Sequence, residues 1–302
     1  MDVSYHSKAK DWLLSAWLGV CTKVQKRPRR LTLMDLYAGD GLNRCKLPDG
    51  SSESWPGSAI RMADAAKLAR HGEVRVILNE LDADRNRALR LALADYAGVV
   101  NPPENQDTIE SIQSFASMLV PQDHNFVFLD PFNHSGIRVD TLRAIASVST
   151  PDRYHDKSFV RRPEIMFTFM TSGMQQSLAE QAIPSLDLFY GGPYWRTHVE
   201  RARKDGVPVY VGFLGALMEA MNDLYPVAQN ATKVYSVRVP RGPLVYFIVF
   251  FATHPLAKDL YEKIRDYAYT HQRADVIRKW TQIEDRTKAI GPKGKPIDAE
   301  WT

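Results

Sequence analysis

Apolar side chains recur at helical spacing near the start of the chain. Between about residues 5 and 20 they share one helical face, at Trp12, Leu13, Ala16, Trp17 and Val20. A basic, proline-containing segment then ends the pattern, because proline cannot continue a helix. Residues 1–30 are therefore predicted to form an N-terminal helix and a basic linker.

Short apolar runs alternate with helical patterns over the middle of the chain. Each run is followed by a polar or glycine-bearing turn and then by residues at helical spacing. The runs are LTLMDLY, VRVILNE, VVN, NFVFLD and EIMFTFM, and the intervening helices are predicted near residues 58–69, 83–96, 109–119 and 140–146. Strands and helices in alternation form βαβ units, so this pattern predicts an α/β fold with a parallel sheet.

The last third of the chain departs from this alternation. KVYSVRVP and PLVYFIVFFAT are two strand-like runs separated by a few residues around Arg241 and Gly242. So short a connection permits an antiparallel hairpin but no parallel crossover. A mostly parallel seven-stranded sheet closed by an antiparallel C-terminal hairpin resembles the Rossmann-like fold of class I S-adenosylmethionine-dependent methyltransferases.

Two internal segments and the tail lie outside this plan. Residues 147–163 and 184–206 are long and weakly periodic, like insertions that serve as lids or binding loops. The tail, residues 287–302, is predicted to be exposed. Residues 1–302 are interpreted as a single methyltransferase-like domain that carries these additions.

Composition is that of an ordinary globular protein, since 44% of the 302 residues are hydrophobic and 25% are charged. No apolar run approaches the roughly 18 residues of a membrane helix, and the N-terminus lacks an apolar signal-peptide core. We therefore expect a cytoplasmic protein with no membrane partner. Cys21 and Cys45 are too few for a disulfide framework or a cysteine-based structural zinc site, and no metal site is predicted.

Positive charge is concentrated locally, although the net charge is only +4. The basic clusters are KVQKRPRR from Lys23 to Arg30, KSFVRR from Lys157 to Arg162, and RTHVERARK from Arg196 to Lys204. Such clusters bind a phosphate backbone, because each neutralised phosphate releases counterions. They make nucleic acid the expected partner, while a solvated basic surface explains any single cluster equally well.

The turn after the first predicted strand, DLYAGDG, is the first candidate site. In a doubly wound sheet a ligand lies beyond the carboxyl ends of the strands where the strand order reverses, normally beside the first strand. Gly39 and Gly41 let the backbone approach a cofactor without a Cβ clash, and Asp35 can fix the loop or accept a hydrogen bond from an ammonium group. A glycine turn that merely connects two elements is the alternative.

Carboxylates also follow the second and third predicted strands. Glu80, with Asp82 as second choice, is placed to accept hydrogen bonds from both hydroxyls of a ribose. Asp107, in the polar cluster Asn105-Gln106-Asp107, is placed to contact an adenine amino group. Asp82 and Asp107 are equally suited to cap the helices that follow them.

The fourth strand delivers Asp130, Pro131 and Phe132, the predicted catalytic residues, to the same edge of the sheet. The carboxylate would orient or deprotonate an acceptor, the proline fixes the exit from the strand, and the ring stacks on a base. Asp-Pro-Phe resembles the Asp-Pro-Pro-Tyr motif of amino-directed nucleic-acid methyltransferases, but it lacks the second proline and its aromatic residue comes one position early. A purely structural Asp130 is the alternative, and His134 is expected to be a surface loop histidine.

The chain as a whole resembles the three-Cys-motif partner family of methyltransferase-like proteins. The segments that carry the resemblance are, in order, YHSKAKDWLLSAWL, DLYAGDG, WPGSAIRMA, NELD, LDPF, YGGPYW and PLVYFIVFFATHPLAKDLYEKI. It implies a methyltransferase fold, S-adenosylmethionine as cofactor, and a cysteine-motif protein as partner. It also implies that Gly57 and Ser58 begin the helix that holds the cofactor's carboxylate. The cofactor-binding set is then Asp35, Tyr37, Ala38, Gly39, Gly41, Ser58, Glu80, Leu81 and Asp107.

Two functions of different classes remain open. The first is an S-adenosylmethionine-dependent methyltransferase that acts on nucleic acid, at a base amino group or another nucleotide position. The second is a catalytically silent cofactor-binding module that regulates or scaffolds a partner protein. The sequence contains no motif for other common catalytic sites: it lacks the GxxxxGKS/T phosphate loop, the HExxH zinc helix and the GxSxG nucleophile elbow.

Overall fold

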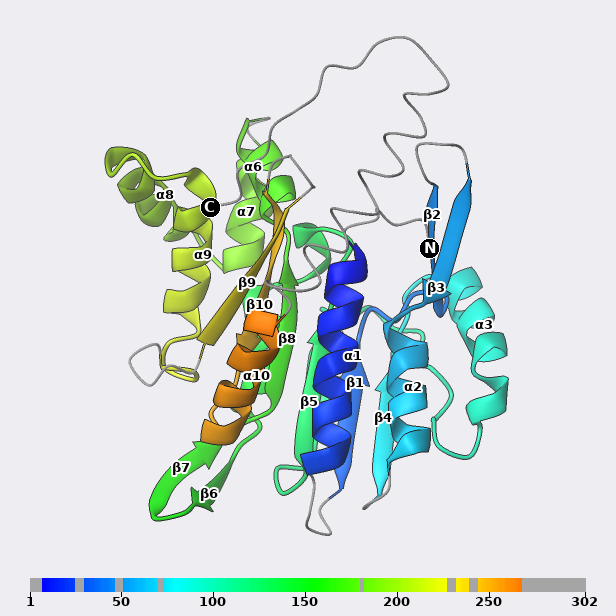
Figure 1. Cartoon of the computed structure of the whole chain (residues 1–302). Coiled ribbons are helices and arrows are strands. Elements are labelled where there is room, and N and C mark those ends of the chain that lie inside the picture. The colour runs from blue at the N-terminus through cyan, green and yellow to red at the C-terminus, as the bar shows by residue number, and fades with distance from the viewer. Residues whose placement is uncertain are drawn as a thin grey trace.

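The computed structural model describes residues 7–24, 30–46, 51–69, 73–179, 182–226, 232–238 and 244–267 (Figure 1). Helix α1 (Ser7–Val24) confirms the predicted leading helix and extends it by about a turn. Most of the basic linker, residues 25–29, and the predicted exposed tail, residues 287–302, lie outside the described residues.

The central sheet has six strands in the order β4-β1-β5-β8-β10-β9. Strands β1, β4, β5 and β8 are mutually parallel, whereas β10 runs antiparallel to both of its neighbours, β8 and β9. This confirms a mostly parallel α/β sheet, and residues 239–243, which join the β9–β10 pair, lie outside the described residues. The bounds are β1 (Leu31–Asp35), β4 (Val74–Leu78), β5 (His124–Leu129), β8 (Glu164–Phe169), β9 (Thr232–Arg238) and β10 (Leu244–Phe251).

The predicted strand at VVN is not a regular strand, so the described part of the sheet has six strands and not seven. Val100 makes an isolated parallel bridge to Val76, and Glu104 makes another to Asn79. Between them stand Pro102 and Pro103, which have no backbone N–H to donate to a ladder. The segment therefore follows the edge of β4 without forming continuous pairing.

Helices cover both faces of the sheet, and strand residues alternate between the two cores. Phe126 and Phe128 of β5 pack toward the face covered by α1, α2 and α10, while Val127 and Leu129 pack toward α4 to α9 (Figure 1). The remaining helix bounds are α2 (Ser58–Leu68), α3 (Ala83–Ala92), α4 (Ile112–Ser117), α5 (Val139–Ser147), α6 (Thr171–Ala179), α7 (Ile183–Tyr190), α8 (Trp195–Lys204), α9 (Val209–Ala220) and α10 (Pro255–Tyr267).

The four predicted intervening helices are present, with shorter bounds in two cases. The helix predicted over 83–96 ends at Ala92 and is followed by a 3-10 turn, Ala94–Tyr96. The helix predicted over 109–119 is shorter and corresponds to α4, Ile112–Ser117. It begins later because Asp107 organises a turn before it, accepting from Ile109 N. Within the described residues, no helix is long and apolar enough to cross a membrane.

Two hairpins are additions to the predicted plan. Strands β2 (Leu42–Lys46) and β3 (Ser52–Pro56) pair between β1 and α2. Strands β6 (Thr150–Tyr154) and β7 (Lys157–Arg161) pair within residues 147–163, which were expected to be a loop. The second predicted insertion, residues 184–206, folds as most of α7 and all of α8.

Candidate functional site

The glycine loop lies at the carboxyl end of β1, where the strand order reverses between β4 and β5. Gly39 has a φ of 65° and Gly41 a φ of 86°, values that residues with a Cβ rarely adopt. A Cβ on Gly41 would also lie 3.2 Å from the Cβ of Ala92. Both glycines are therefore required by the backbone path itself.

The β2–β3 hairpin separates this loop from α2 in sequence but not in space. Gly57 N donates to Gly41 O at 2.9 Å and returns the chain to the loop. Gly57 is the N-cap residue of α2, and Ser58 is its first helical residue. Since glycine has no side chain, it cannot accept hydrogen bonds from the first-turn amides, which leaves these donors for an anion.

Asp35 is fully buried at the end of β1. Its Oδ1 accepts from Tyr37 N at 3.0 Å, whereas its Oδ2 has no hydrogen-bond partner within the described residues. Burial raises the pKa of Asp35 to about 7, against the lowering influence of the Ser58 hydroxyl and the Tyr37 amide. A buried carboxylate oxygen without a partner is costly, and a ligand's positive group would satisfy it.

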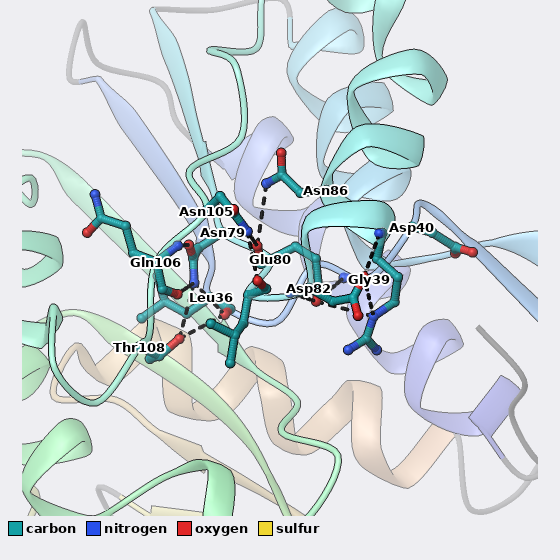
Figure 2. Close-up of polar contacts among 12 residues, drawn as sticks. Leu36, Gly39, Asp40, Asn79, Glu80, Asp82, Asn86, Asn105, Gln106 and Thr108 are labelled. Carbon is teal, nitrogen blue, oxygen red and sulfur yellow. Dashed lines mark hydrogen bonds and ion pairs between the residues drawn. The ribbon is translucent and has the colours of Figure 1, made fainter.

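Glu80 holds the glycine loop against the end of β4 (Figure 2). Its Oε2 accepts from Gly39 N at 2.9 Å, and its Oε1 accepts from Asp82 N at 2.9 Å. Arg85 Nε lies 3.3 Å from Oε1. Glu80 is therefore a loop-fixing residue first, with further lone pairs on each oxygen for a ribose. Asp82 caps α3 by accepting from Arg85 N at 2.8 Å, which is the alternative left open for it.

Asn79, which sequence reasoning missed, ties the end of β4 to the loop that follows Glu104 (Figure 2). Its Nδ2 donates to Leu36 O at 3.3 Å and to Gln106 O at 3.0 Å, and its Oδ1 accepts from Gln106 N at 3.0 Å. Thr108 Oγ1 also donates to Leu36 O at 3.1 Å. These bonds place the loops after β1 and β4 side by side.

The remaining predicted cofactor residues line the same edge of the sheet. Asp107 Oδ1 accepts from Ile109 N at 2.8 Å, so this residue organises its turn, and its contact with adenine stays a prediction. Tyr37 Oη donates to Gly136 O at 2.7 Å and joins the glycine loop to the loop after β5. Ala38 is buried beneath the loop, whereas Leu81 is exposed.

Asp130, at the end of β5, forms an ion pair with Lys10 of α1. Lys10 is buried and Asp130 is partly exposed. Burial opposes the charge of Lys10, but Asp130, Asp11 and Asp35 outweigh that effect and raise the pKa of Lys10 above its ordinary value. Lys10 was missed because the contact spans 120 positions of sequence. A signal was available, because Lys10 stands three positions before Leu13 on the apolar face of α1.

Asp11 connects the same helix to the β2–β3 hairpin. Its Oδ2 accepts from Asn43 Nδ2 at 2.8 Å and from Trp55 Nε1 at 2.6 Å. Burial raises the pKa of Asp11. The first turn of α1 is thus held between the β2–β3 hairpin and the end of β5, where Lys10 also feels the charge of the buried Asp35.

The other residues after β5 differ in exposure. Pro131 is buried, and Phe132 is 77% exposed beside Asp130. His134 was expected at the surface, but it is buried against α7. Its Nε2 lies 3.1 Å from Ser185 Oγ of that helix. Burial lowers the pKa of His134. Of the three predicted catalytic residues, Asp130 and Phe132 therefore retain exposed surface.

The basic clusters do not gather in one place. Residues 157–162 lie on β7 and just beyond, next to the amino ends of the parallel strands, where Arg161 pairs with Asp152 at 3.0 Å. On α8, Arg201, Arg203 and Lys204 are exposed. The cluster from Lys23 to Arg30 lies mostly outside the described residues.

No family model and no curated protein matches the chain, so its resemblance to the three-Cys-motif partner family stays a prediction. Solved structures with a similar path include protein LPL1258 from Legionella pneumophila, at 10% identity and a TM-score of 0.48, covering 86% of this chain and 92% of that one. The O-methyltransferase TomG from Streptomyces achromogenes, in complex with S-adenosylmethionine, has 12% identity and a TM-score of 0.40, covering 83% and 90%.

Fibrillarin from Aeropyrum pernix, with natively bound S-adenosylmethionine, has 10% identity and a TM-score of 0.36, covering 80% of this chain and 76% of that one. Likeness at this level does not establish the family, the cofactor or the reaction of this chain.

Proposed function

We propose that the protein is an S-adenosylmethionine-dependent methyltransferase that acts on nucleic acid. The observation that carries the proposal is the buried Asp35 carboxylate, whose Oδ2 has no hydrogen-bond partner within the described residues. It lies at the reversal of strand order, beside two glycines with positive φ and a helix whose N-cap is glycine. Doubly wound sheets bind nucleotide-like ligands at this point.

The residues present fit the groups of this cofactor. Asp35 would accept from the ammonium group, and the free amides at the start of α2 would hold the carboxylate. Glu80 would accept from the ribose hydroxyls while it retains Gly39. Asp107 would face the adenine amino group. When bound, S-adenosylmethionine supplies an electrophilic methyl group.

Asp130 and Lys10 are the groups that would act on the acceptor. Lys10 holds the Asp130 carboxylate in position at the edge of the sheet. Asp130 would accept a hydrogen bond from the acceptor's N–H or O–H and take up its proton as the nucleophile loses it. The buried Pro131 fixes the exit from β5, so Phe132 projects beside the carboxylate.

Nucleic acid is the acceptor that these surroundings favour. Phe132 offers an exposed ring on which an unstacked base can lie. Exposed Arg201, Arg203 and Lys204 of α8 add positive charge for a phosphate backbone. The cluster at residues 157–162 contributes less, because it lies toward the opposite edge of the sheet and Arg161 is already paired.

One observation favours the second function, a silent module that binds the cofactor and regulates a partner. The ion pair with Lys10 compensates the charge of Asp130 and satisfies one of its oxygens before any acceptor arrives. If Lys10 never releases that oxygen, Asp130 serves only to fix α1 to the sheet.

Labelled methyl transfer separates the two functions. The full-length protein is incubated with S-adenosylmethionine carrying a tritiated methyl group and, separately, with total RNA, genomic DNA and cell protein. Transfer to nucleic acid that falls at least about 100-fold in Asp130→Asn, with calorimetric cofactor binding unchanged, supports the enzyme. Cofactor binding without transfer to any of the three pools favours the silent module.

A further inference from the structure

A second cavity lies near the amino ends of the parallel strands, away from the glycine loop. Its volume is about 690 Å³, and its walls come from α1, α10, the β6–β7 hairpin and the first residues of β5 and β8. Strand β5 advances about 3.3 Å per residue, so His124 at its start and Asp130 beyond its end are roughly 20 Å apart. Chemistry in this cavity is therefore independent of the candidate methyltransferase site.

Cys21, His124 and Glu164 meet at the wall of this cavity. One ligand atom from each, sulfur, ring nitrogen and carboxylate oxygen, lies within 4.8 Å of the other two. His124 Nε2 is 3.0 Å from Glu164 Oε2. Cys21 and Glu164 are buried, and His124 is partly exposed to the cavity. The three residues belong to three elements, α1, β5 and β8, so the cluster arises only in the folded chain.

The donor set matches zinc in type, charge and spacing. Zn²⁺ takes thiolate, imidazole and carboxylate ligands in a tetrahedron, with sulfur and nitrogen donors about 3.5 Å apart at ordinary bond lengths. His124 Nε2 and Glu164 Oε2, at 3.0 Å, are already that close, and the other separations, which are within 4.8 Å, would shorten by up to about 1.3 Å to reach that spacing. Thiolate and carboxylate together carry two negative charges, which balance a divalent cation in a buried place.

We propose that Cys21, His124 and Glu164 bind one Zn²⁺ ion and leave its fourth position open to the cavity. Three protein ligands with an open position are the pattern of reactive zinc sites, whereas closed structural sites use four. His254 also lines the cavity, but its Nδ1 accepts from Leu256 N at 3.2 Å and its ring packs edge-on against Tyr154. The ring is thereby committed to positioning α10, and a water molecule completes the site.

The site also has a mechanical consequence. An α-helix rises about 1.5 Å per residue, so Lys10 and Cys21 are roughly 16 Å apart along α1. The Lys10–Asp130 ion pair fixes the start of this helix at one edge of the sheet. The zinc ion fixes its other end to β5 and β8 at the opposite edge.

Cobalt substitution tests the proposal, because the chain has only two cysteines. Tag-free full-length protein is stripped with a chelator and titrated with Co²⁺. We expect one equivalent to bind with a thiolate-to-cobalt charge-transfer band and the visible bands of a tetrahedral ion. Cys21→Ser should abolish the charge-transfer band, and Cys45→Ser should retain it. His124→Ala and Glu164→Gln should weaken binding by at least the roughly 10–100-fold that loss of a ligand's hydrogen-bond partner costs.

X-ray absorption of the zinc-loaded wild-type protein decides the matter even if Cys21→Ser fails to fold. One sulfur and three nitrogen or oxygen neighbours support the site. Three results would overturn the zinc site: the folded, stripped protein binds no stoichiometric Co²⁺, the charge-transfer band persists in Cys21→Ser, or X-ray absorption finds no sulfur among the metal's neighbours. In that case His124 and Glu164 form a simple ion pair beside a buried thiol.

Discussion

Lys10 and Asp130 form a largely buried ion pair across 120 positions of sequence, and this pair joins the first turn of α1 to the end of β5. Both side chains are largely shielded from water, at 9% and 16% exposure. Removal of one partner from such a pair strands a buried charge, which costs far more than loss of an exposed pair. The pair can therefore be tested by stability alone.

Lys10→Met should lower the free energy of unfolding by about 3 kcal/mol, because Asp130 is left with an uncompensated charge. The double variant Lys10→Met/Asp130→Asn should recover most of this loss, since both charges are then gone. Urea denaturation followed by circular dichroism measures each value. Arg87→Met is the control, because the Arg87–Asp84 pair is exposed and should contribute less than about 1 kcal/mol. Additive effects of the two changes would refute coupling between Lys10 and Asp130.

Asp35 should make stability depend on pH. Its pKa is raised in the folded protein to about 7, so the folded state keeps a proton that the unfolded state has already lost. Its contribution to stability is therefore largest at low pH and is lost as pH rises from about 4 to about 7. Denaturation measured across this window should show a shallower decline in Asp35→Asn than in wild type. Identical pH profiles would mean that Asp35 keeps an ordinary pKa.

The same ionisation should control cofactor binding. If Asp35 accepts from the ammonium group, it must be ionised in the complex, so affinity should rise with pH. At pH 6, about one unit below the pKa of about 7, affinity for S-adenosylhomocysteine should be roughly tenfold below its plateau. Calorimetry between pH 5.5 and 7.5 measures the profile. Asp35→Asn should bind S-adenosylhomocysteine weakly, and its affinity should not change with pH. If the variant keeps the wild-type pH dependence of affinity, another group is the one that titrates.

Glu80→Gln should weaken both the glycine loop and the ligand. The new amide group must face either Gly39 N or Asp82 N, so one buried hydrogen bond is lost and two donors meet. The free energy of unfolding should fall by about 1–3 kcal/mol, with a comparable loss in binding energy for S-adenosylhomocysteine. Asp84→Asn, on the exposed face of α3, should change neither quantity. Unchanged affinity in Glu80→Gln would remove Glu80 from the ligand site.

Gly41→Ala tests whether the loop conformation is essential. The backbone has a φ of 86°, and the added Cβ would press on Ala92 at 3.2 Å, so stability should fall by about 1–3 kcal/mol. Gly98→Ala is the matched control, because a Cβ there meets nothing within 4 Å. Equal thermal midpoints for the two variants would show that the loop relaxes freely.

Phe132→Ala should affect the acceptor and not the fold. The ring is 77% exposed, so its removal should leave the thermal midpoint unchanged. Loss of one stacked base should weaken binding to single-stranded RNA by about 1–3 kcal/mol in a fluorescence titration. Leu91→Ala, at 75% exposure on α3, controls for loss of an exposed apolar side chain. If Phe132→Ala binds single-stranded RNA as tightly as wild type, the base does not stack on Phe132 and must bind elsewhere.

The strands that form the buried sheet could be predicted from sequence because their apolar runs are strong. LTLMD and EIMFTF are buried at every position, and both were placed correctly. The β2–β3 and β6–β7 hairpins were missed because their strands are short, polar and mostly exposed, so no apolar alternation marks them.

Some residues of the candidate site could also be predicted from the sequence, and others could not. Gly39, Gly41 and Glu80 could be found because each follows directly after a recognisable strand. Lys10 left one signal, its place on the apolar face of α1, but its partner Asp130 is known only from the folded chain. Asn79 left none, because its role depends on the loop at Gln106 that only the folded chain brings near it. His134 was misjudged because α7, which buries it, was not anticipated.

The packing of Trp17 joins the first and the last described helices across one face of the sheet. This residue of α1 packs against Phe126 of β5 and, closer, against Phe250 of β10, with ring centroids 4.7 Å apart. Its third partner, Tyr261, stands on the last described helix. Trp17 therefore reaches its full packing only after more than two hundred further residues have been made, so α1 cannot complete its tertiary contacts before β10 and α10 exist.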